Sequence, residues 1–257
     1  MNGKVKLNSR IGEVFITNEG YKIEIVEYNN CDDLLIEFQD KYKTRIPARY
    51  RHCKTGKIRN PNHPSVLGVG RLGIGDYKCS INGKTTVFYD LWNGVLERGF
   101  DLKFKEKHPT YNEVIVNPEC FCFQDFAKWL DDNWYDIEGE RMEVDKDILV
   151  KGNKEYRFDR MILVPQRINT LFVKSDAIRG DYPIGVSYIK NTNKYQAKCK
   201  VDGKTKYLGC YDTPEKAFEV YKQFKETYIK EVADEYKDKI PKKLYDAMYV
   251  YEIDIND

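Results

Sequence analysis

The last third of the chain combines three short alternating segments with one long amphipathic segment. The alternating segments are 184–189, 195–201 and 206–211. Their period of two predicts β-strands, and Asp202-Gly203 between the second and third is typical of a two-residue hairpin turn. Thr213-Pro214 then supplies a helix N-cap and a first-turn proline, and an apolar stripe follows as far as Val232. We therefore expect a three-stranded antiparallel sheet with a helix packed on one face.

The second of these strands separates a basic face from an apolar face. Lys194, Gln196, Lys198 and Lys200 fall on one side, and Tyr195, Ala197 and Cys199 fall on the other. A sheet covered by a helix on one face leaves its other face free. Lysines spaced two apart on that free face suit the phosphates and guanine edges of a DNA major groove. The alternative is an ordinary solvated surface, because lysine is common on any protein exterior.

Charge is unevenly distributed along the chain, although the net charge is only +2. Residues 41–59 hold eight Lys or Arg and no acid, whereas acids outnumber bases from residue 90 to 165. The first eighty residues also contain β-rich stretches separated by turns, at 12–17, 21–28 and 34–39. We therefore predict a β-rich, basic N-terminal module, residues 1–88. Its basic residues, including Arg49 and Arg51, are expected to contact DNA phosphates.

The cysteines and the lengths of the apolar runs indicate the cellular compartment of the protein. Seven cysteines form no paired framework, the first residues have no apolar stretch of a signal peptide, and no run is long enough to span a membrane. We expect free thiols, a cytoplasmic location and no membrane partner. Cys120 and Cys122 form a C-x-C pair, but zinc needs further ligands at a matching spacing, so ordinary buried cysteine is the favoured interpretation.

The middle third is more helical, with apolar residues at helical spacing in 89–99 and 123–134. After these segments, residues 141–149 predict a strand and Lys151-Gly152-Asn153 a turn. Residues 161–164 predict a second strand, and Pro165 is well placed to open a short helix, 166–172. The order is thus strand, loop, strand, helix. Together the three parts give an α+β fold.

The C-terminal third resembles the APETALA-type (ethylene-response-factor) DNA-binding domain, which is also found at the end of phage homing endonucleases. The matching motifs are Gly185-Val186, Lys194-Tyr195-Gln196-Ala197, Tyr207-Leu208-Gly209-Cys210-Tyr211-Asp212-Thr213, Glu215-Lys216-Ala217 and Tyr221. The resemblance implies a DNA-binding domain over residues 176–257, with its sheet in the major groove. By position it implies contacts from Ser187, Lys198, Lys200 and Tyr207. The family is often arginine- and tryptophan-rich where this chain has lysine and tyrosine.

The middle third resembles phage-encoded HNH homing endonucleases. The motifs, in order, are Trp92-Asn93-Gly94-Val95, Pro109-Thr110-Tyr111, Phe126-Ala127-Lys128-Trp129, Val144-Asp145-Lys146-Asp147, Gly152-Asn153, Tyr156, Val164-Pro165 and Ile168-Asn169. The resemblance implies a nuclease domain over residues 89–175 that contains a ββα-metal finger. In that family an acid ending the first strand and an Asn or His on the helix hold a divalent metal, and a His beside the acid activates water.

The resemblance assigns Asp145 and Asn169 as ligands of Mg²⁺ or Mn²⁺, which prefer such oxygen donors. Lys146 stands in the catalytic position of the expected His, and a lysine with an ordinary pKa of about 10.4 stays protonated at neutral pH. The family's Ser-Pro-Glu-Asn/Thr-Cys run is also replaced, by Arg157-Phe158-Asp159-Arg160-Met161. Two functions are therefore open: a homing-type endonuclease acting on double-stranded DNA, or a catalytically silent DNA-binding protein on the same scaffold. The alternative for Asp145 and Asn169 is a loop carboxylate and a helix-surface amide.

Overall fold

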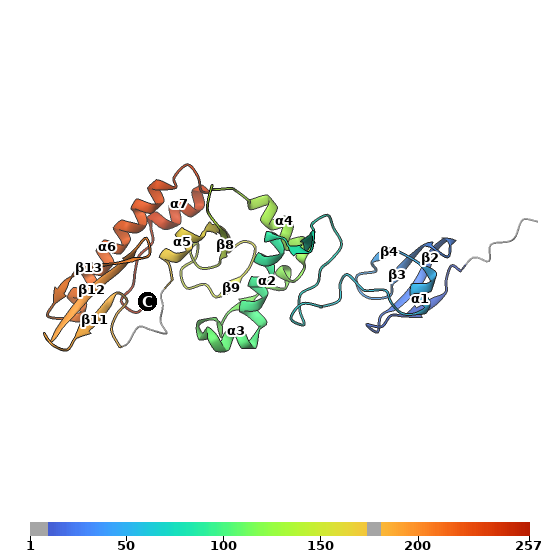
Figure 1. The fold of residues 1–257 in the computed structure, drawn as a ribbon, viewed down its shortest axis with the longest axis horizontal. Helices are drawn as coiled ribbons and strands as arrows, with labels where there is room; N and C mark the ends of the chain where they lie inside the picture. The colour runs from blue at the N-terminus through green and yellow to red at the C-terminus, as the bar shows by residue number, and fades with distance from the viewer. Residues whose placement is uncertain (1–9, 174–180) are drawn as a thin grey trace, which may run out of the picture.

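The computed structural model describes residues 10–173 and 181–257 and has the α+β fold predicted from the sequence. The molecule is elongated (Figure 1). A small β-sheet module lies at one end, a three-stranded sheet lies at the other, and the helices of the middle third lie between them. Within the described residues, no helix is both long and apolar enough to cross a membrane.

The N-terminal module is an antiparallel sheet of four strands in sequence order, followed by one short helix. The elements are β1 (Val14–Ile16), β2 (Lys22–Asn30), β3 (Asp33–Phe38), β4 (Arg45–Ala48) and α1 (Tyr50–Lys54). Alternate residues of β2 and β3, such as Ile25 and Ile36, are fully buried and pack with Cys53 of α1. The first three strands confirm the sequence prediction. The fourth strand and the helix were missed because charged residues dominate that stretch.

The middle third begins with a hairpin and two packed helices. Its elements are β5 (Ser80–Ile81), β6 (Lys84–Thr85), α2 (Val87–Phe100), α3 (Leu102–Lys107), η1 (Pro109–Tyr111), β7 (Ile115–Val116), η2 (Pro118–Phe121) and α4 (Phe123–Asn133). Asn82 and Gly83, between β5 and β6, have positive φ, as a two-residue hairpin turn requires. Trp92 of α2 is fully buried against Phe123 of α4, and its indole N–H donates to the Cys120 carbonyl at 2.8 Å. These contacts form the core beneath the candidate site.

A strand, a loop, a second strand and a helix follow in the predicted order. They are β8 (Met142–Asp145), β9 (Glu155–Tyr156), β10 (Ile162–Pro165) and α5 (Gln166–Leu171), and β8 pairs antiparallel with β10. The predicted extension of the first strand to residue 149 was wrong. The chain turns at Asp145, because its Oδ1 accepts the backbone N–H groups of Asp147 and Ile148 at 2.8 and 2.7 Å. Such a side-chain acceptor competes with strand pairing.

The C-terminal third contains the predicted sheet and helix. The strands are β11 (Val186–Ile189), β12 (Lys194–Val201) and β13 (Lys204–Tyr211), all antiparallel, and α6 (Pro214–Glu235) follows. Asp202 and Gly203 have positive φ in the hairpin turn, and the Thr213 hydroxyl caps α6 by accepting from the N–H of Lys216. Ala197 of β12 is buried against Ala217 and the other core residues of α6. The predicted one-sided burial of the sheet is therefore confirmed.

The end of the chain folds back as α7 (Lys242–Tyr249) and a short extended segment, 250–257. One apolar core joins β10 and α5 to the second half of α6 and to α7. It contains Ile162, Val164, Ile168, Leu171, Tyr228, Ile229, Val232, Ala233, Leu244 and Met248. The predicted domain boundary at 175/176 lies outside the described residues. Because of the shared core, the C-terminal third and the β8–β10–α5 unit bury apolar surface against each other.

Lys225 of α6 is a buried cation, with only 7% of its surface exposed. Within the described ranges it makes no hydrogen bond or ion pair, and its ammonium lies 5.8 Å from the ring centre of Tyr228. Burial lowers the pKa of Lys225. The folded protein therefore loses this proton at a lower pH than the unfolded chain, whose lysines have pKa values of about 10.4.

We expect Lys225→Met to stabilise the protein at pH 7 by about 1–3 kcal/mol, because an uncompensated buried charge is removed. The gain should shrink as the pH rises toward about 10.4 and vanish above it, where the lysine is neutral in both states. Thermal melts of both proteins from pH 7 upward measure this difference. Lys230→Met, on the exposed side of α6, is the control and should show no such trend. A loss of stability at pH 7 in Lys225→Met would contradict the prediction.

Candidate functional site

The acidic face of the β8–β10–α5 unit is formed by alternate residues of β8. Glu143 and Asp145 pair with Val164 and Ile162 across the strands, so all four lie on one face. Helix α5 packs on that face. There the side-chain amide of Asn169 donates to Glu143, and Gln166 Nε2 donates to Glu143 Oε1 at 3.0 Å. The structure therefore places Asn169 on the face that carries Asp145, but bonds it to Glu143.

The carboxyl group of Asp145 is desolvated and has a carboxylate neighbour. Burial, and secondly the charge of Asp147, raise the pKa of Asp145 to about 7, while the N–H groups of Ile148 and Asp147 oppose the shift. The charge of Asp147 thus disfavours the ionised form of Asp145, whereas a positive charge nearby would stabilise it.

Lys146 follows Asp145 directly, and its side chain is only 12% exposed. Its ammonium forms an ion pair with Asp147 at 3.1 Å and lies 6.0 Å from the ring centre of Tyr156. The sequence-predicted residues Asp145 and Lys146 are thus held together at the end of β8. The ion pair places the Lys146 ammonium at the end of the Asp147 side chain and near the Tyr156 ring.

Asn153 closes the loop that follows Lys146. Its Nδ2 donates to the backbone carbonyls of Lys146 at 2.6 Å and Glu155 at 2.8 Å, and its Oδ1 accepts from the N–H of Glu155. Gly152, just before it, has a φ of +80°, a conformation that glycine adopts without strain. These contacts give the Gly-Asn motif a physical role: they fix the loop that presents Lys146.

Sequence reasoning missed Arg98 and assigned no role to Tyr111 or Tyr156. Tyr156 is 3% exposed, and burial raises the pKa of its hydroxyl. The charge of Arg98 opposes this shift, whereas the charges of Asp145 and Asp147 add to it. Arg98 of α2 lies 6.0 Å from the ring centre of Tyr111. Although burial opposes it, Tyr156, Tyr111 and Glu143 raise the pKa of Arg98. The charge of Arg98 therefore acts on Glu143, and no sequence spacing signals this, because only the packing of α2 on β8 brings the two together.

The donor chemistry of this face fits a hard divalent cation. Glu143 and Asp145 offer carboxylate oxygens, and the amide oxygen of Asn169 accepts no hydrogen bond from the described part of the chain. Across residues 10–173 and 181–257, no group of three or more His, Cys, Asp or Glu side chains is arranged to hold a metal. The candidate pair, Asp145 and Asn169, is a different donor set, a carboxylate with an amide.

The second candidate site is the outer face of the C-terminal sheet. The cross-strand register places Ser187 opposite Gln196, Lys198 opposite Tyr207 and Ile189 opposite Lys194, on the side away from α6. All five residues predicted here lie on this face: Ser187, Lys194, Lys198, Lys200 and Tyr207. Tyr207 is 56% exposed. Lys194 pairs with Asp212 at 3.2 Å, whereas Lys198 and Lys200 have no ion-pair partner in the described ranges.

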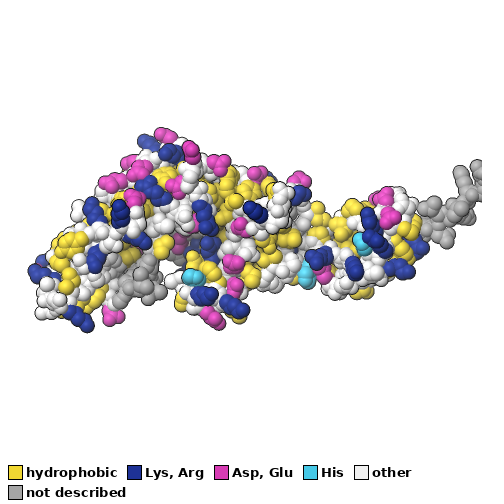
Figure 2. Space-filling model, in the orientation of Figure 1, with side chains coloured by type: hydrophobic (Ala, Val, Ile, Leu, Met, Phe, Trp, Pro, Cys, Tyr) yellow, Lys and Arg dark blue, Asp and Glu magenta, His cyan; other side chains and the backbone are white. Residues whose placement is uncertain are grey.

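The N-terminal module carries the third cluster. All eight Lys and Arg residues of the 41–59 stretch are exposed, and Figure 2 shows basic side chains on this module. Arg49 precedes α1 and lies 3.8 Å from Asp32, and Arg45 pairs with Glu37 at 2.9 Å. Arg51, on α1, has no ion-pair partner among the described residues. Both predicted arginines, Arg49 and Arg51, are thus at the surface.

Comparison of this chain with protein-family models, with curated proteins and with solved structures found no match in any of the three.

Proposed function

We propose that this protein binds double-stranded DNA through the outer face of the β11–β13 sheet. The observation that supports the proposal best is the alignment of Lys198, Lys200 and Tyr207 on the exposed face, while α6 fills the opposite face. A narrow antiparallel sheet fits the major groove, where lysines reach phosphates and guanine edges. The two unpaired lysines would gain partners on DNA without breaking an ion pair in the protein.

The N-terminal module adds a second basic surface in this proposal. Arg49 and Arg51 would contact phosphates, which strengthens binding without reading sequence. Among the described residues, only Arg45 and Arg49 of the eight basic side chains of residues 41–59 have an acidic partner, so counterion release from DNA is the expected contribution of this stretch.

The β8–β10–α5 unit is proposed to be an HNH-like ββα finger that makes the protein a homing-type DNA endonuclease. Asp145 and Asn169 would hold Mg²⁺ or Mn²⁺, with Glu143 beside them, and the ion would stabilise charge on the scissile phosphate. Lys146 would place a positive charge near that phosphate and stabilise negative charge there. Asn153 would keep the Lys146 backbone in place through its bond to the carbonyl.

A catalytically silent DNA-binding protein is the second candidate. It is favoured by Lys146, whose ammonium is paired with Asp147 and offers no acceptor for a proton from water. It is also favoured by the hydrogen bond between Asn169 and Glu143, which is an ordinary structural contact. On this alternative, the sheet and the basic module alone carry the function.

Binding is tested by replacing Lys198 and Lys200 with Ala together. We expect weaker binding of a labelled duplex, and a slope of log affinity against log salt that is smaller by about 0.9 for each lysine that contacts a phosphate. Fluorescence anisotropy at several KCl concentrations measures both. The matched control removes Lys216 and Lys230, two exposed lysines of α6, and should leave the slope unchanged. Equal effects of the two double variants would mean that the sheet face has no special role.

Metal-dependent cleavage is tested by Asp145→Ala in a nicking assay on supercoiled plasmid with Mg²⁺ or Mn²⁺. We expect nicking to disappear while the anisotropy binding curve stays unchanged, because Asp145 lies on the finger and not on the sheet. Circular dichroism checks that the variant is folded. Nicking that survives in Asp145→Ala would remove this residue from the site.

The role of Lys146 is tested by Lys146→His. A histidine beside Asp145 restores a base that is partly neutral at pH 7, and general-base assistance typically contributes 10²–10⁴-fold to the rate. We expect the nicking rate of Lys146→His to rise above that of the wild type, at most by this factor. The control, Lys154→His in the same loop, should leave the nicking rate unchanged. Strong nicking by the wild type that is lost in Lys146→His would make the lysine the working residue. No nicking by either protein would favour the silent DNA-binding alternative.

A further inference from the structure

Helix α6 packs against both parts of the molecule that carry the acidic face and the lysine-bearing sheet face. Its first half, with Ala217, Phe218 and Tyr221, covers the sheet. Its second half, with Ile229 and Val232, packs on β10 and α5. The helix has 22 residues, which corresponds to about 33 Å at 1.5 Å per residue. One continuous element of secondary structure therefore joins the two sites (Figure 1).

Arg167 of α5 connects the same parts through charge. Its Nε lies 3.2 Å from Asp202 Oδ1, and its Nη1 lies 2.6 Å from Glu235 Oε2. Asp202 is in the β12–β13 hairpin turn, where it also accepts from the Tyr228 hydroxyl at 2.9 Å, and Glu235 ends α6. The guanidinium lies 5.6 Å from the ring centre of Tyr236. One side chain thus joins α5, the sheet and α6.

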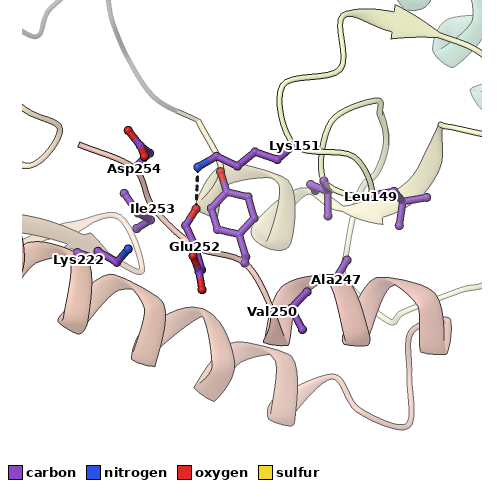
Figure 3. A pocket seen from close by; sticks show the side chains of 10 residues that line it. Leu149, Lys151, Lys222, Ala247, Val250, Glu252, Ile253 and Asp254 are labelled. Atoms are coloured by element: carbon purple, nitrogen blue, oxygen red, sulfur yellow. Dashed lines mark hydrogen bonds between the residues drawn. The ribbon is translucent and has the colours of Figure 1, made fainter. Parts of the chain in front are cut away.

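The final residues of the chain add a third connection. Ile253 is buried in the core beneath the sheet, and its N–H donates to Glu226 of α6 at 2.8 Å. Tyr251 packs edge-on against Phe172, with ring centres 4.7 Å apart. Lys151, in the loop after Asp145, donates to the Glu252 carbonyl at 2.7 Å (Figure 3). A cavity of about 330 Å³ lies between this loop, α6 and α7.

We infer that the C-terminal sheet and the β8–β10–α5 unit form one rigid body, with Arg167 as the positioning residue that fixes the hairpin to α5. Its meaning for DNA rests on the proposed DNA binding. Its consequence is that the groove read by the sheet determines where the finger meets the duplex, at a constant number of base pairs from the recognition site.

The apolar core supplies most of the cohesion, and Arg167 sets the geometry. Its partners Asp202 and Glu235 are more than half exposed, so each ion pair alone adds little stability. The guanidinium, however, offers several donors in a fixed plane and here uses two of them on carboxylates from different elements. A lysine presents its three donors from one nitrogen on a flexible stem, so it has no rigid plane to fix the two carboxylates relative to each other.

Hydrogen exchange of the full-length protein in increasing urea tests the rigid body without DNA. We expect amides of β10 and β12 to exchange with the same urea dependence, because a single opening exposes both. In Arg167→Ala, β12 amides should exchange about tenfold faster than in the wild type while β10 amides change little, and Arg167→Lys should restore only part of the protection. Arg157→Ala, which removes an ion pair within the finger loop, is the control. Independent exchange of β10 and β12 in the wild type would overturn the rigid body, and an Arg167→Ala variant that behaves like the control would overturn the role of Arg167.

The register on DNA is tested with an iron chelate tethered to a cysteine at Val150, an exposed position in the finger loop. The background replaces Cys31, Cys79 and Cys210 with Ser, since these are the cysteines that are not buried. The probe is a duplex recovered by selection from a random-sequence pool. Peroxide should produce one narrow cleavage zone at a fixed offset from the footprint, and the zone should spread in Arg167→Ala at unchanged affinity.

A broad zone or no zone in the wild type, or an equally narrow zone in Arg167→Ala, would contradict the inference. If no duplex is recovered, the proposed DNA binding fails, and the exchange experiment still decides whether the rigid body exists.

Discussion

The burial of α6 on two sides is the constraint on which the C-terminal two thirds of the molecule depend. Tyr221 packs under the sheet and Val232 packs against β10 and α5, and both residues belong to the one helix α6. Since the helix occupies the inner face of the sheet, the lysine-bearing face is the one left in solvent. The same helix also completes the apolar layer beneath α5, which carries Asn169. The position of α6 therefore explains both why the lysine-bearing sheet face is exposed and why α5 is held in place.

Local chemistry explains why much of the fold was predictable from the sequence. Asn82-Gly83 and Asp202-Gly203 adopt the positive φ values that few other residue pairs accept, and Thr213 caps α6 through its own hydroxyl. Each of these signals acts within four residues, so no tertiary information is needed to interpret it. Strand β4 shows the limit of such signals. Ile46 and Ala48 of this strand are partly buried and alternate with exposed residues. The alternation is only four residues long and lies among many charged residues, so the sequence did not predict a strand there.

The parts of the candidate sites that could not be predicted arise from contacts between distant segments or from irregular pairing. If the side chains of β13 alternated strictly, Tyr207 would lie on the same face as Gly209 and Tyr211 and would point toward α6. A β-bulge between Ala197 and Lys198 shifts the register, so that Tyr207 lies opposite Lys198 on the outer face. Only the resemblance, and not the periodicity, predicted that position. Arg98 and the bond between Glu143 and Asn169 likewise depend on how α2 and α5 pack on β8.

The hydrogen bond from Asn169 to Glu143 favours the silent alternative as it stands, but it does not oppose metal binding, because the oxygen and nitrogen of an amide are similar in size and can exchange positions. A carboxylate beside an amide requires a donor, so the nitrogen faces Glu143 in this arrangement. A cation shared by Glu143 and Asp145 would instead require the amide oxygen, and half a turn of the Asn169 amide exchanges the two atoms at nearly the same volume. The aspartate at residue 145 offers no such choice, because its Oδ1 already accepts two backbone N–H groups. The loop geometry at Asp145 therefore belongs to the fold, whereas the orientation of Asn169 depends on which group Glu143 faces.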